Sequence, residues 1–387
     1  MGAINELFKR NIRQYGMIIA LIFISIFFQI LTDGILLKPL NVTNLILQNS
    51  YILVLAIGMV LVIITGHIDL SVGSVAAFIG ALSAIMMVKM DMNPVLAVFL
   101  SLLMGAIVGA WQGFWVAYVK IPAFIVTLAG MLLFRGLTMI VLNGQSIAPF
   151  PKAFQKISSG FIPDVFGGSS QHLLTLIVGI LLSLVVIYQE FRTRRTTVKY
   201  GFEQGSVWLS VAKAAALVII INLFTFVLAQ YNGIPNILII LLVLIAIYSF
   251  VMNRMTMGRH IYALGGNEKA ASLSGVKTKR VTFWVFVNMG VMAALCGLVF
   301  AARLNSATPK AGTNFELDAI AACFIGGASA SGGIGTVVGA IIGGLVMGVM
   351  NNGMSLVGLG VDWQQGIKGL VLLLAVGFDI YNKSKTA

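Results

Sequence analysis

The sequence has few charged residues. Asp, Glu, Lys and Arg make up 10% of its 387 residues, whereas an ordinary soluble domain has about 25%. Apolar residues instead make up 59%, and the mean hydropathy is +1.00. One soluble core of this size cannot bury that much apolar surface. The composition therefore excludes a soluble enzyme, a nucleic-acid-binding domain, a disordered protein and a secreted disulfide scaffold.

Cysteine and acidic residues are also scarce. Cys296 and Cys323 are the only cysteines, and both lie in apolar stretches, so we interpret them as buried hydrophobic side chains. They predict neither a disulfide framework nor a metal site. The net charge of +13 arises from 25 Lys and Arg against 12 Asp and Glu. In a membrane protein, such an excess reflects basic residues kept on the cytoplasmic side and does not imply a nucleic-acid partner.

Motifs of ATP hydrolysis and metal catalysis are absent from the sequence. There is no G-x-x-x-x-G-K-[ST], so the chain is not expected to bind and hydrolyse ATP through a P-loop. There is no H-E-x-x-H, and His67, His172 and His260 are far apart. No bound metal is therefore predicted, and catalysis is not expected.

Long apolar runs occupy most of the chain. Each is too long and too uniformly apolar for a barrel strand, so the sequence predicts an all-α polytopic membrane protein with about 10–12 spans. The run at 317–331 is short and rich in glycine, so it is a half-helix, a re-entrant segment or a full span. The runs are 15–32, 48–65, 70–88, 94–119, 122–142, 172–188, 206–230, 234–252, 281–302, 317–331, 333–352 and 362–381.

Basic residues predict the orientation of the spans. Twelve crossings from a cytoplasmic N-terminus return the C-terminus to the cytoplasm, and they place basic segments 192–199 and 254–280 there too. The segments 143–171 and 303–318 should then face outward, on the periplasmic side. The first contains several Pro and Gly residues and is expected to be irregular. We expect residues 1–387 to form a single transmembrane domain.

Glycines recur at four-residue intervals in two of the runs. Such spacing lines one face of a helix with small residues and lets a second backbone approach closely. Tight packing is the simpler interpretation, and faces that slide during transport are the alternative. The two sets are Gly105, Gly109 and Gly113, and Gly335, Gly339 and Gly343.

The first polar break between apolar runs is GHIDLSVGS, at residues 66–74. An ionisable residue at membrane depth is a candidate functional residue, which singles out Asp69. The alternative is a polar turn at the cytoplasmic surface, in which Asp69 or Ser71 caps the next helix. Gly66 and Gly73 are expected to mark the helix break or to allow close helix packing. The two interpretations do not exclude each other.

A second break is GGASASGGIG, at residues 326–335. Transporters often contain internal repeats whose helices break at corresponding positions. This break is therefore a candidate counterpart of 66–74 in a two-fold internal repeat, although the similarity is too short to establish duplication. The glycines expected to interrupt the helices are Gly326, Gly327, Gly332 and Gly333.

The cytoplasmic segment at about 254–280 predicts a short helix over Asn267–Ser274. Asn267 suits the N-cap, Glu268 the first turn and Gly275 the C-cap. A short polar helix has little stability of its own. It needs a docking surface, which is either the protein's own helix ends or a cytoplasmic partner.

With these features the chain resembles the permease subunits of bacterial sugar ABC importers, in the ribose and xylose branch. The resemblance covers most of the chain, is less diagnostic over 151–232, and is strongest toward xylose and multiple-monosaccharide permeases. Directly before Ile68 and Asp69, where this family often has a small residue, the chain has His67. The role of His67 stays open. The resemblance is carried by residues 65–74, 121–128, 265–275, 324–336, 351–355, 368–370 and 379–381.

The resemblance implies a function and a set of partners. Two permease copies would form a pathway for a monosaccharide, such as xylose or a related pentose or hexose, across the bacterial inner membrane. A cytoplasmic ATP-binding subunit would carry ATP and Mg, a periplasmic sugar-binding protein would deliver the sugar, and this chain would bind no cofactor. The family's coupling segment to the ATPase corresponds here to Gly265, Asn267, Glu268, Ala270, Ala271 and Gly275.

Sugar hydroxyls are bound by hydrogen-bonding groups and aromatic faces rather than by ion pairs. Trp115 is a further candidate, and for both Trp111 and Trp115 the alternative is an interfacial anchor near the end of a span. The candidate residues for the pathway are Gln48, Asn49, Asp69, Ser71, Trp111 and Gln112.

A secondary transporter driven by an ion gradient is the alternative function. Such a transporter usually couples the ion through an intramembrane charge, and Asp69 is the one good candidate in the sequence. An intramembrane enzyme is disfavoured by the absent motifs.

Overall fold

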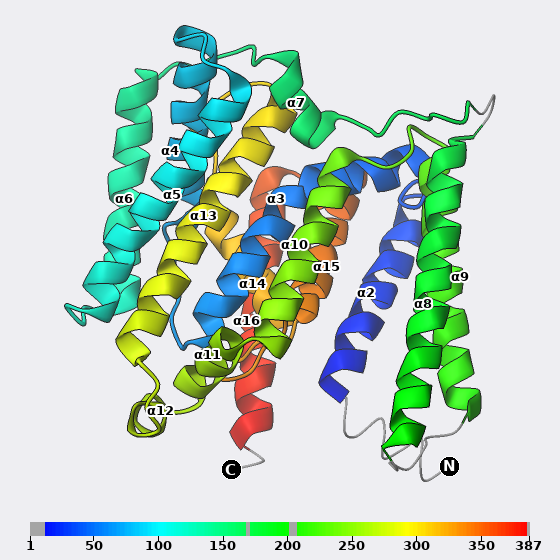
Figure 1. Cartoon of the computed structure of the whole chain (residues 1–387). Helices are drawn as coiled ribbons and strands as arrows, with labels where there is room; N and C mark the ends of the chain where they lie inside the picture. The colour runs from blue at the N-terminus through cyan, green and yellow to red at the C-terminus, as the bar shows by residue number, and fades with distance from the viewer. Residues whose placement is uncertain (1–11, 168–170, 201–206, 385–387) are drawn as a thin grey trace. The chain divides into compact units, whose positions relative to one another are not determined.

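The computed structural model describes residues 12–167, 171–200 and 207–384, and these residues form helices and loops without a β-strand (Figure 1). The all-α class is confirmed. The helices are α2 (Ile12–Leu31), α3 (Pro39–Ile64), α4 (Val72–Ala84) with a π-helical extension (Ile85–Lys89), α5 (Pro94–Ala117), α6 (Ala123–Leu142), α7 (Lys152–Ser159), α8 (Leu173–Lys199), α9 (Val207–Ala229), α10 (Asn236–Arg254), α11 (Thr256–Gly266), α12 (Glu268–Leu273), α13 (Thr278–Leu304), α14 (Phe315–Ile325), α15 (Val337–Leu356) and α16 (Val361–Ser384).

Each of the twelve apolar runs coincides with one helix. In the described part of the chain, nine helices are long and apolar enough to cross a membrane, namely α3, α4 with its extension, α5, α6, α8, α9, α10, α13 and α15. The shorter apolar part of α2 covers Gly16–Leu31. The run 317–331 forms only α14, which ends at Ile325, so the glycines shorten this helix. Both chain termini, predicted to be cytoplasmic, lie outside the described residues.

Contacts divide the chain into two compact units. The second unit comprises Leu37–Asn44 and Gly160–Asn236. Its core is the antiparallel pair α8 and α9, where Gly179 packs directly on Thr225. The side-chain amide of Asn222 on α9 donates a hydrogen bond of 2.7 Å to the hydroxyl of Ser183 on α8. These small and polar residues let the two apolar helices approach closely.

The first unit comprises the described residues of Met1–Leu36, Leu45–Ser159 and Ile237–Ala387, and α13 lies at its centre. α5 packs along α13 in the antiparallel direction, as Figure 1 shows. The predicted close packing of the first glycine set is confirmed, because each member lies against the α13 backbone or side chains. The pairs are Gly105 with Gly290, Gly109 with Phe286, and Gly113 with Phe283.

The second glycine set is only partly helical. Gly339 and Gly343 lie on α15 and pack against Gly326 and Ala322 of the α14 end. Gly335, however, precedes α15 and has a φ of 157°, so it is part of the loop and not of the helix face. Thr336 begins the helix instead, because its hydroxyl accepts the backbone N–H of Gly339 at 2.9 Å.

The segment 143–171, predicted to be irregular, contains the helix α7. The rings of Phe150 and Phe154 are buried in a cluster with residues of α4 and α13, such as Ala84 and Ala301. Burial of these aromatic side chains outweighs the turn-forming Pro and Gly residues on either side.

The order of elements occurs twice. A long helix, an irregular segment, a short helix and two long helices follow one another as α3, 65–71, α4, α5, α6 and again as α13, 305–314, α14, α15, α16. In this order of elements, 305–314 takes the position that the break at 66–74 takes in the first stretch. The later break lies one element further on, between α14 and α15.

Candidate functional site at the meeting of two short helices

The short helices α4 and α14 meet at their N-termini. Gly73, in the first turn of α4, lies against the backbone of Gly312, just before α14, and neither position has room for a Cβ atom. Of the two roles predicted for these glycines, Gly73 therefore has the packing role, and Gly66 has the helix-breaking role at the end of α3. Interrupted helices of this kind place their N-termini and free backbone groups at the solute sites of transporters.

Three acidic side chains are buried around this meeting point. Asp69 precedes α4, whereas Glu316 and Asp318 lie in the first turn of α14. Of the two interpretations of Asp69, its burial favours the functional candidate over a surface turn, and the segment 303–318, predicted to face outward, contains the start of α14. Negative side chains are favoured in the first turn of a helix, because the helix dipole is positive there.

Glu316 lies directly at the contact between the two helices. Its Oε2 atom borders Gly73 of α4 and has no hydrogen-bond partner among the described residues. Nearby, the Arg135 guanidinium on α6 donates a hydrogen bond of 2.6 Å to the carbonyl of Ala311. The irregular segment before α14 is thus held to α6 as well as to α4.

Three of the predicted pathway residues form one hydrogen-bonded network. The backbone N–H and the hydroxyl of Ser71 donate to Oδ1 of Asp69 at 2.8 Å and 2.6 Å. The amide of Gln112 on α5 donates to the Ser71 hydroxyl at 2.7 Å. All three side chains are buried. The network fixes the segment 65–71 to α5 and satisfies the N–H of Ser71, the residue that begins α4.

The other three predicted pathway residues do not join this network. The Asn49 amide donates to the carbonyl of Leu45 within α3. Gln48 interacts through its backbone, because its carbonyl accepts a hydrogen bond of 3.5 Å from Arg303. Trp111 is 39% exposed and packs edge-on against the ring of Phe134.

A cavity of about 440 Å³ lies beside the meeting point. The hydroxyl of Tyr51 on α3 donates to Asp318 at 3.3 Å, and Lys368 of α16 lies 3.0 Å from the same carboxylate. Sequence reasoning missed all three residues as site residues. Asp318 and Lys368 carried a usable signal, because each is an ionisable residue within an apolar run. The lining includes Tyr51, Asn314, Asp318, Gln364, Gln365 and Lys368.

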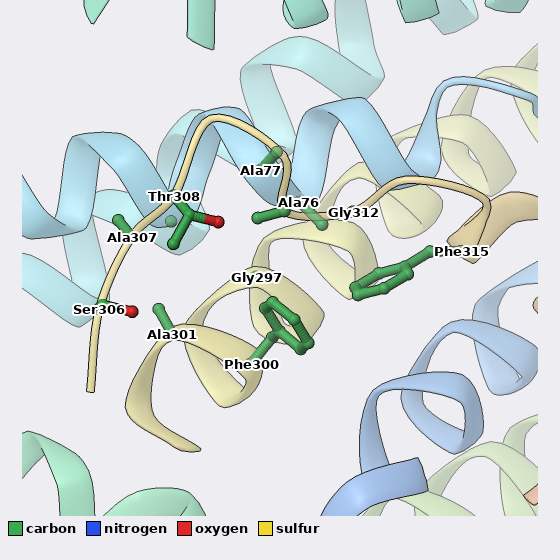
Figure 2. A pocket seen from close by; sticks show the side chains of 12 residues that line it. Ala76, Ala77, Gly297, Phe300, Ala301, Ser306, Ala307, Thr308, Gly312 and Phe315 are labelled. Atoms are coloured by element: carbon green, nitrogen blue, oxygen red, sulfur yellow. The ribbon is translucent and has the colours of Figure 1, made fainter. Parts of the chain in front are cut away.

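A second cavity lies between α4, α13 and the segment before α14 (Figure 2). Its volume is about 10 Å³, which accommodates at most one water molecule. Gly312 and Ala76 lie side by side there, and the rings of Phe300 and Phe315 close the space. This region is therefore a packing contact and not a solute site.

The predicted short helix is present as α12. The side chain of Asn267 caps it by accepting the N–H of Ala270 at 3.0 Å, and Gly275 follows it with a φ of 85°. Ala271 is buried, so its side chain packs within the chain. The exposed apolar residue of this helix is Leu273, which is 90% exposed and was not predicted.

The helix α12 lies close to the segment 65–71. Glu268 forms an exposed ion pair with Lys120, with 3.1 Å between Oε1 and Nζ. His67 lines a cavity together with both residues. The pKa of the His67 imidazole lies below its usual value. Burial is the largest cause and Lys120 adds to it, whereas the Glu268 carboxylate acts in the opposite direction. Neutral His67 therefore packs between α12 and the start of the polar network.

Three segments join where α3 ends. The N–H of Gly333 donates to the carbonyl of Ile64 at 2.8 Å. Gly265, in the last turn of α11, packs directly on the same carbonyl. Tyr262 of α11 adds a hydrogen bond of 2.7 Å from its hydroxyl to the carbonyl of Gly335. The helix α11 therefore contacts both the end of α3 and the loop between α14 and α15.

Of the remaining glycines predicted to break helices, Gly326 ends α14, whereas Gly327, Gly332 and Gly333 lie in the following loop. Within the described ranges, no group of three or more His, Cys, Asp and Glu residues could hold a metal ion. Cys296 and Cys323 are buried and are not joined in a disulfide.

Comparison with known proteins gives a family and several full-length relatives. The family described as branched-chain amino acid transport system / permease component matches residues 41–376. The xylose transport system permease protein of Haemophilus influenzae is 40% identical over 375 residues, covering 97% of this chain and 98% of that protein. The xylose transport system permease protein of Escherichia coli K12 is 39% identical over 385 residues, covering 100% of this chain and 96% of that protein.

A ribose permease is also similar over most of its length. The ribose import permease protein of Bacillus subtilis strain 168 is 33% identical over 372 residues, covering 96% of this chain and 94% of that protein. No solved structure matches the chain.

Proposed function

This chain belongs to the family described as branched-chain amino acid transport system / permease component, and we propose that it is the permease of an importer for xylose or a related monosaccharide. The resemblance to permease subunits of sugar ABC importers is confirmed by the similarity to xylose and ribose permeases. The chain is a multi-pass membrane protein, and its relatives are transport permeases.

The meeting of α4 and α14 is the observation that supports this function best. It places buried hydrogen-bonding side chains, among them Asp69, Ser71 and Gln112, beside two interrupted helices. These three side chains bond one another and hold the meeting point together, whereas polar side chains that line the adjacent cavity, such as Tyr51 and Asn314, can hydrogen-bond the hydroxyls of a neutral solute. The comparisons give no support to the alternative of an ion-driven transporter.

The partners follow from the same proposal. A cytoplasmic ATP-binding subunit, which carries ATP and Mg, docks on α12, whose exposed Leu273 offers an apolar contact. A sugar-binding protein docks on the opposite, periplasmic side of the bacterial inner membrane, and a second permease copy completes the pathway. ATP binding displaces α12, and the contacts at Ile64 transmit this displacement to α4 and α14.

Uptake by a reconstituted importer tests the function. The chain is reconstituted in proteoliposomes with its ATP-binding subunit, ATP is enclosed or omitted, and radiolabelled xylose is supplied with the binding protein. We expect uptake only in vesicles in which the ATPase can hydrolyse ATP. Arabinose, ribose, galactose and glucose, each offered in the same way, then define the preferred sugar.

Two controls separate the proposal from its alternative. Ionophores that remove proton and sodium gradients should leave the uptake unchanged. Sugar uptake by the chain alone, driven by an imposed ion gradient, would instead assign it to the ion-driven transporters. Absence of uptake for every monosaccharide by an intact, ATP-hydrolysing complex would refute the proposed solute class.

A further inference from the structure

We propose that the cavity between α3, α14, α15 and α16 is a monosaccharide-binding site within the pathway, in which Tyr51, Asp318 and Lys368 bind sugar hydroxyl groups. This inference rests on the proposed function and assigns a place on this chain to the sugar. The three residues are brought together from positions far apart in the sequence, on three helices.

The ion pair indicates that the cavity contains water. The Asp318 side chain is 5% exposed and that of Lys368 is 24% exposed, and both belong to apolar helices. Ionisable side chains in such helices are costly in contact with lipid, so they face the protein interior or a water-filled space. Lys368 lines the cavity, which is therefore the water-filled space that its ammonium group reaches.

Lys368 and Asp318 have hydrogen-bond donors and acceptors that are left over for a ligand. An ammonium group has three donors and a carboxylate about four acceptor sites, and the contacts between Lys368, Asp318 and Tyr51 use only part of them. A sugar hydroxyl both donates and accepts a hydrogen bond, so one hydroxyl can bind Asp318 and Lys368 together. Hydrogen bonds to charged groups are also stronger than those between neutral groups.

The remaining lining matches the two sides of a sugar ring. Leu317, Met347 and Leu372 provide an apolar wall, which suits the C–H face of a pyranose. Asn314 adds a neutral amide, which binds a further hydroxyl. The volume of about 440 Å³ falls within the range of about 300–1,000 Å³ typical of small-molecule sites. A monosaccharide and a few bridging waters fill such a space.

The site is assembled from both halves of the chain. Tyr51 belongs to α3 in the first set of elements, whereas Asp318 and Lys368 belong to α14 and α16 in the second. Movement of one set relative to the other separates Tyr51 from the ion pair. Binding is then strongest in the conformation seen here and weaker after the change of access, which allows the sugar to leave.

Substituted-cysteine labelling tests the site with a readout other than transport. Gln365→Cys places a thiol in the cavity lining, and the native Cys296 and Cys323 are buried and contribute little background. The control is Gly366→Cys, the next residue on the same helix. A Cβ atom at Gly366 meets nothing within 4 Å, and this position does not line the cavity.

The full complex in proteoliposomes is exposed to a charged, membrane-impermeant methanethiosulfonate, with and without the transported sugar and its binding protein. We expect Gln365→Cys to react readily without sugar, whereas Gly366→Cys, in open space outside the cavity, should react at the same rate with and without sugar. Sugar at roughly ten times its Kd should slow the reaction of Gln365→Cys about tenfold, because the thiol is reached only when the site is empty. If Gln365→Cys impairs assembly, Leu317→Cys on the opposite wall serves as the reporter.

Two outcomes would overturn the proposal. A cavity thiol that does not react would show that the cavity is dry, and a thiol that reacts equally with and without sugar would show that sugar does not occupy it. Uptake by the unmodified complex is measured in the same preparation. If labelling shows no sugar in the cavity but uptake is intact, the proposed site is wrong and the proposed function stands. If uptake is also absent, the proposed function itself is wrong.

Discussion

Replacing Gly265 with alanine is expected to abolish sugar uptake and to reduce sharply the amount of folded chain in the membrane. A methyl group at this position would overlap the carbonyl oxygen of Ile64 and press on the N–H of Gly333. These two groups form the hydrogen bond of 2.8 Å that joins the end of α3 to the loop after α14. Overpacking among side chains costs about 1–3 kcal/mol, and backbone atoms yield less readily.

The neighbouring glycine provides the matched control. Gly266 lies in the same last turn of α11, so Gly266→Ala changes helix propensity by a similar amount. A Cβ atom at Gly266 meets nothing within 4 Å. Fluorescence-detected size-exclusion chromatography measures folded chain, and vesicle uptake measures transport. Equal behaviour of the two variants would show that the contact at Ile64 is dispensable.

Removing the charge of Lys368 is expected to destabilise the chain by about 3–5 kcal/mol, because Lys368→Met leaves a buried carboxylate without its counter-charge. Asp318 lies 3.0 Å from the lysine nitrogen and is almost completely buried. Adding Asp318→Asn to Lys368→Met should recover most of the lost stability, since a neutral amide costs less to bury than a carboxylate. Thermal unfolding of the purified chain in detergent measures both effects.

The ion pair between Lys120 and Glu268 is the control for Lys368→Met. It is similar in length, at 3.1 Å, but both side chains are about half exposed. Exposed pairs contribute about 0–1 kcal/mol, so Lys120→Met should change thermal unfolding little. A small effect of Lys368→Met, or no recovery in the double variant, would contradict the buried pair. Recovery of stability without recovery of uptake would agree with a role of this pair in binding the sugar.

The helical fold was predictable because it depends on local sequence, namely on the apolar runs and on the residues that cap each helix. Each apolar run must form a helix in a membrane, and Asn267 and Gly275 mark the ends of α12 through ordinary capping chemistry. The glycine set at Gly105 likewise predicted a close helix contact, since spacing alone places such residues on one face.

The site was less predictable because it depends on contacts between distant segments. Local sequence left open whether Asp69 lies in a surface turn or at membrane depth, and only the fold shows that Ser71, beside it, is bonded to Gln112, 41 residues away. The pairing of Asp318 with Tyr51 spans 267 positions. Similarly, the glycine-rich composition of 326–335 suggested a counterpart of the first break, whereas the order of elements puts 305–314 in the corresponding position.

Co-purification of the ATP-binding subunit tests most directly whether α12 connects this permease to its ATPase. The tagged chain is extracted gently from membranes as wild type, as Leu273→Asp, and as Val198→Asp, which makes the same change at an exposed apolar residue of α8. We expect wild type and Val198→Asp to retain the ATP-binding subunit, and Leu273→Asp to lose it while staying folded. Full retention by Leu273→Asp would contradict docking on α12, and no ATPase with the wild type would contradict an ATP-driven importer.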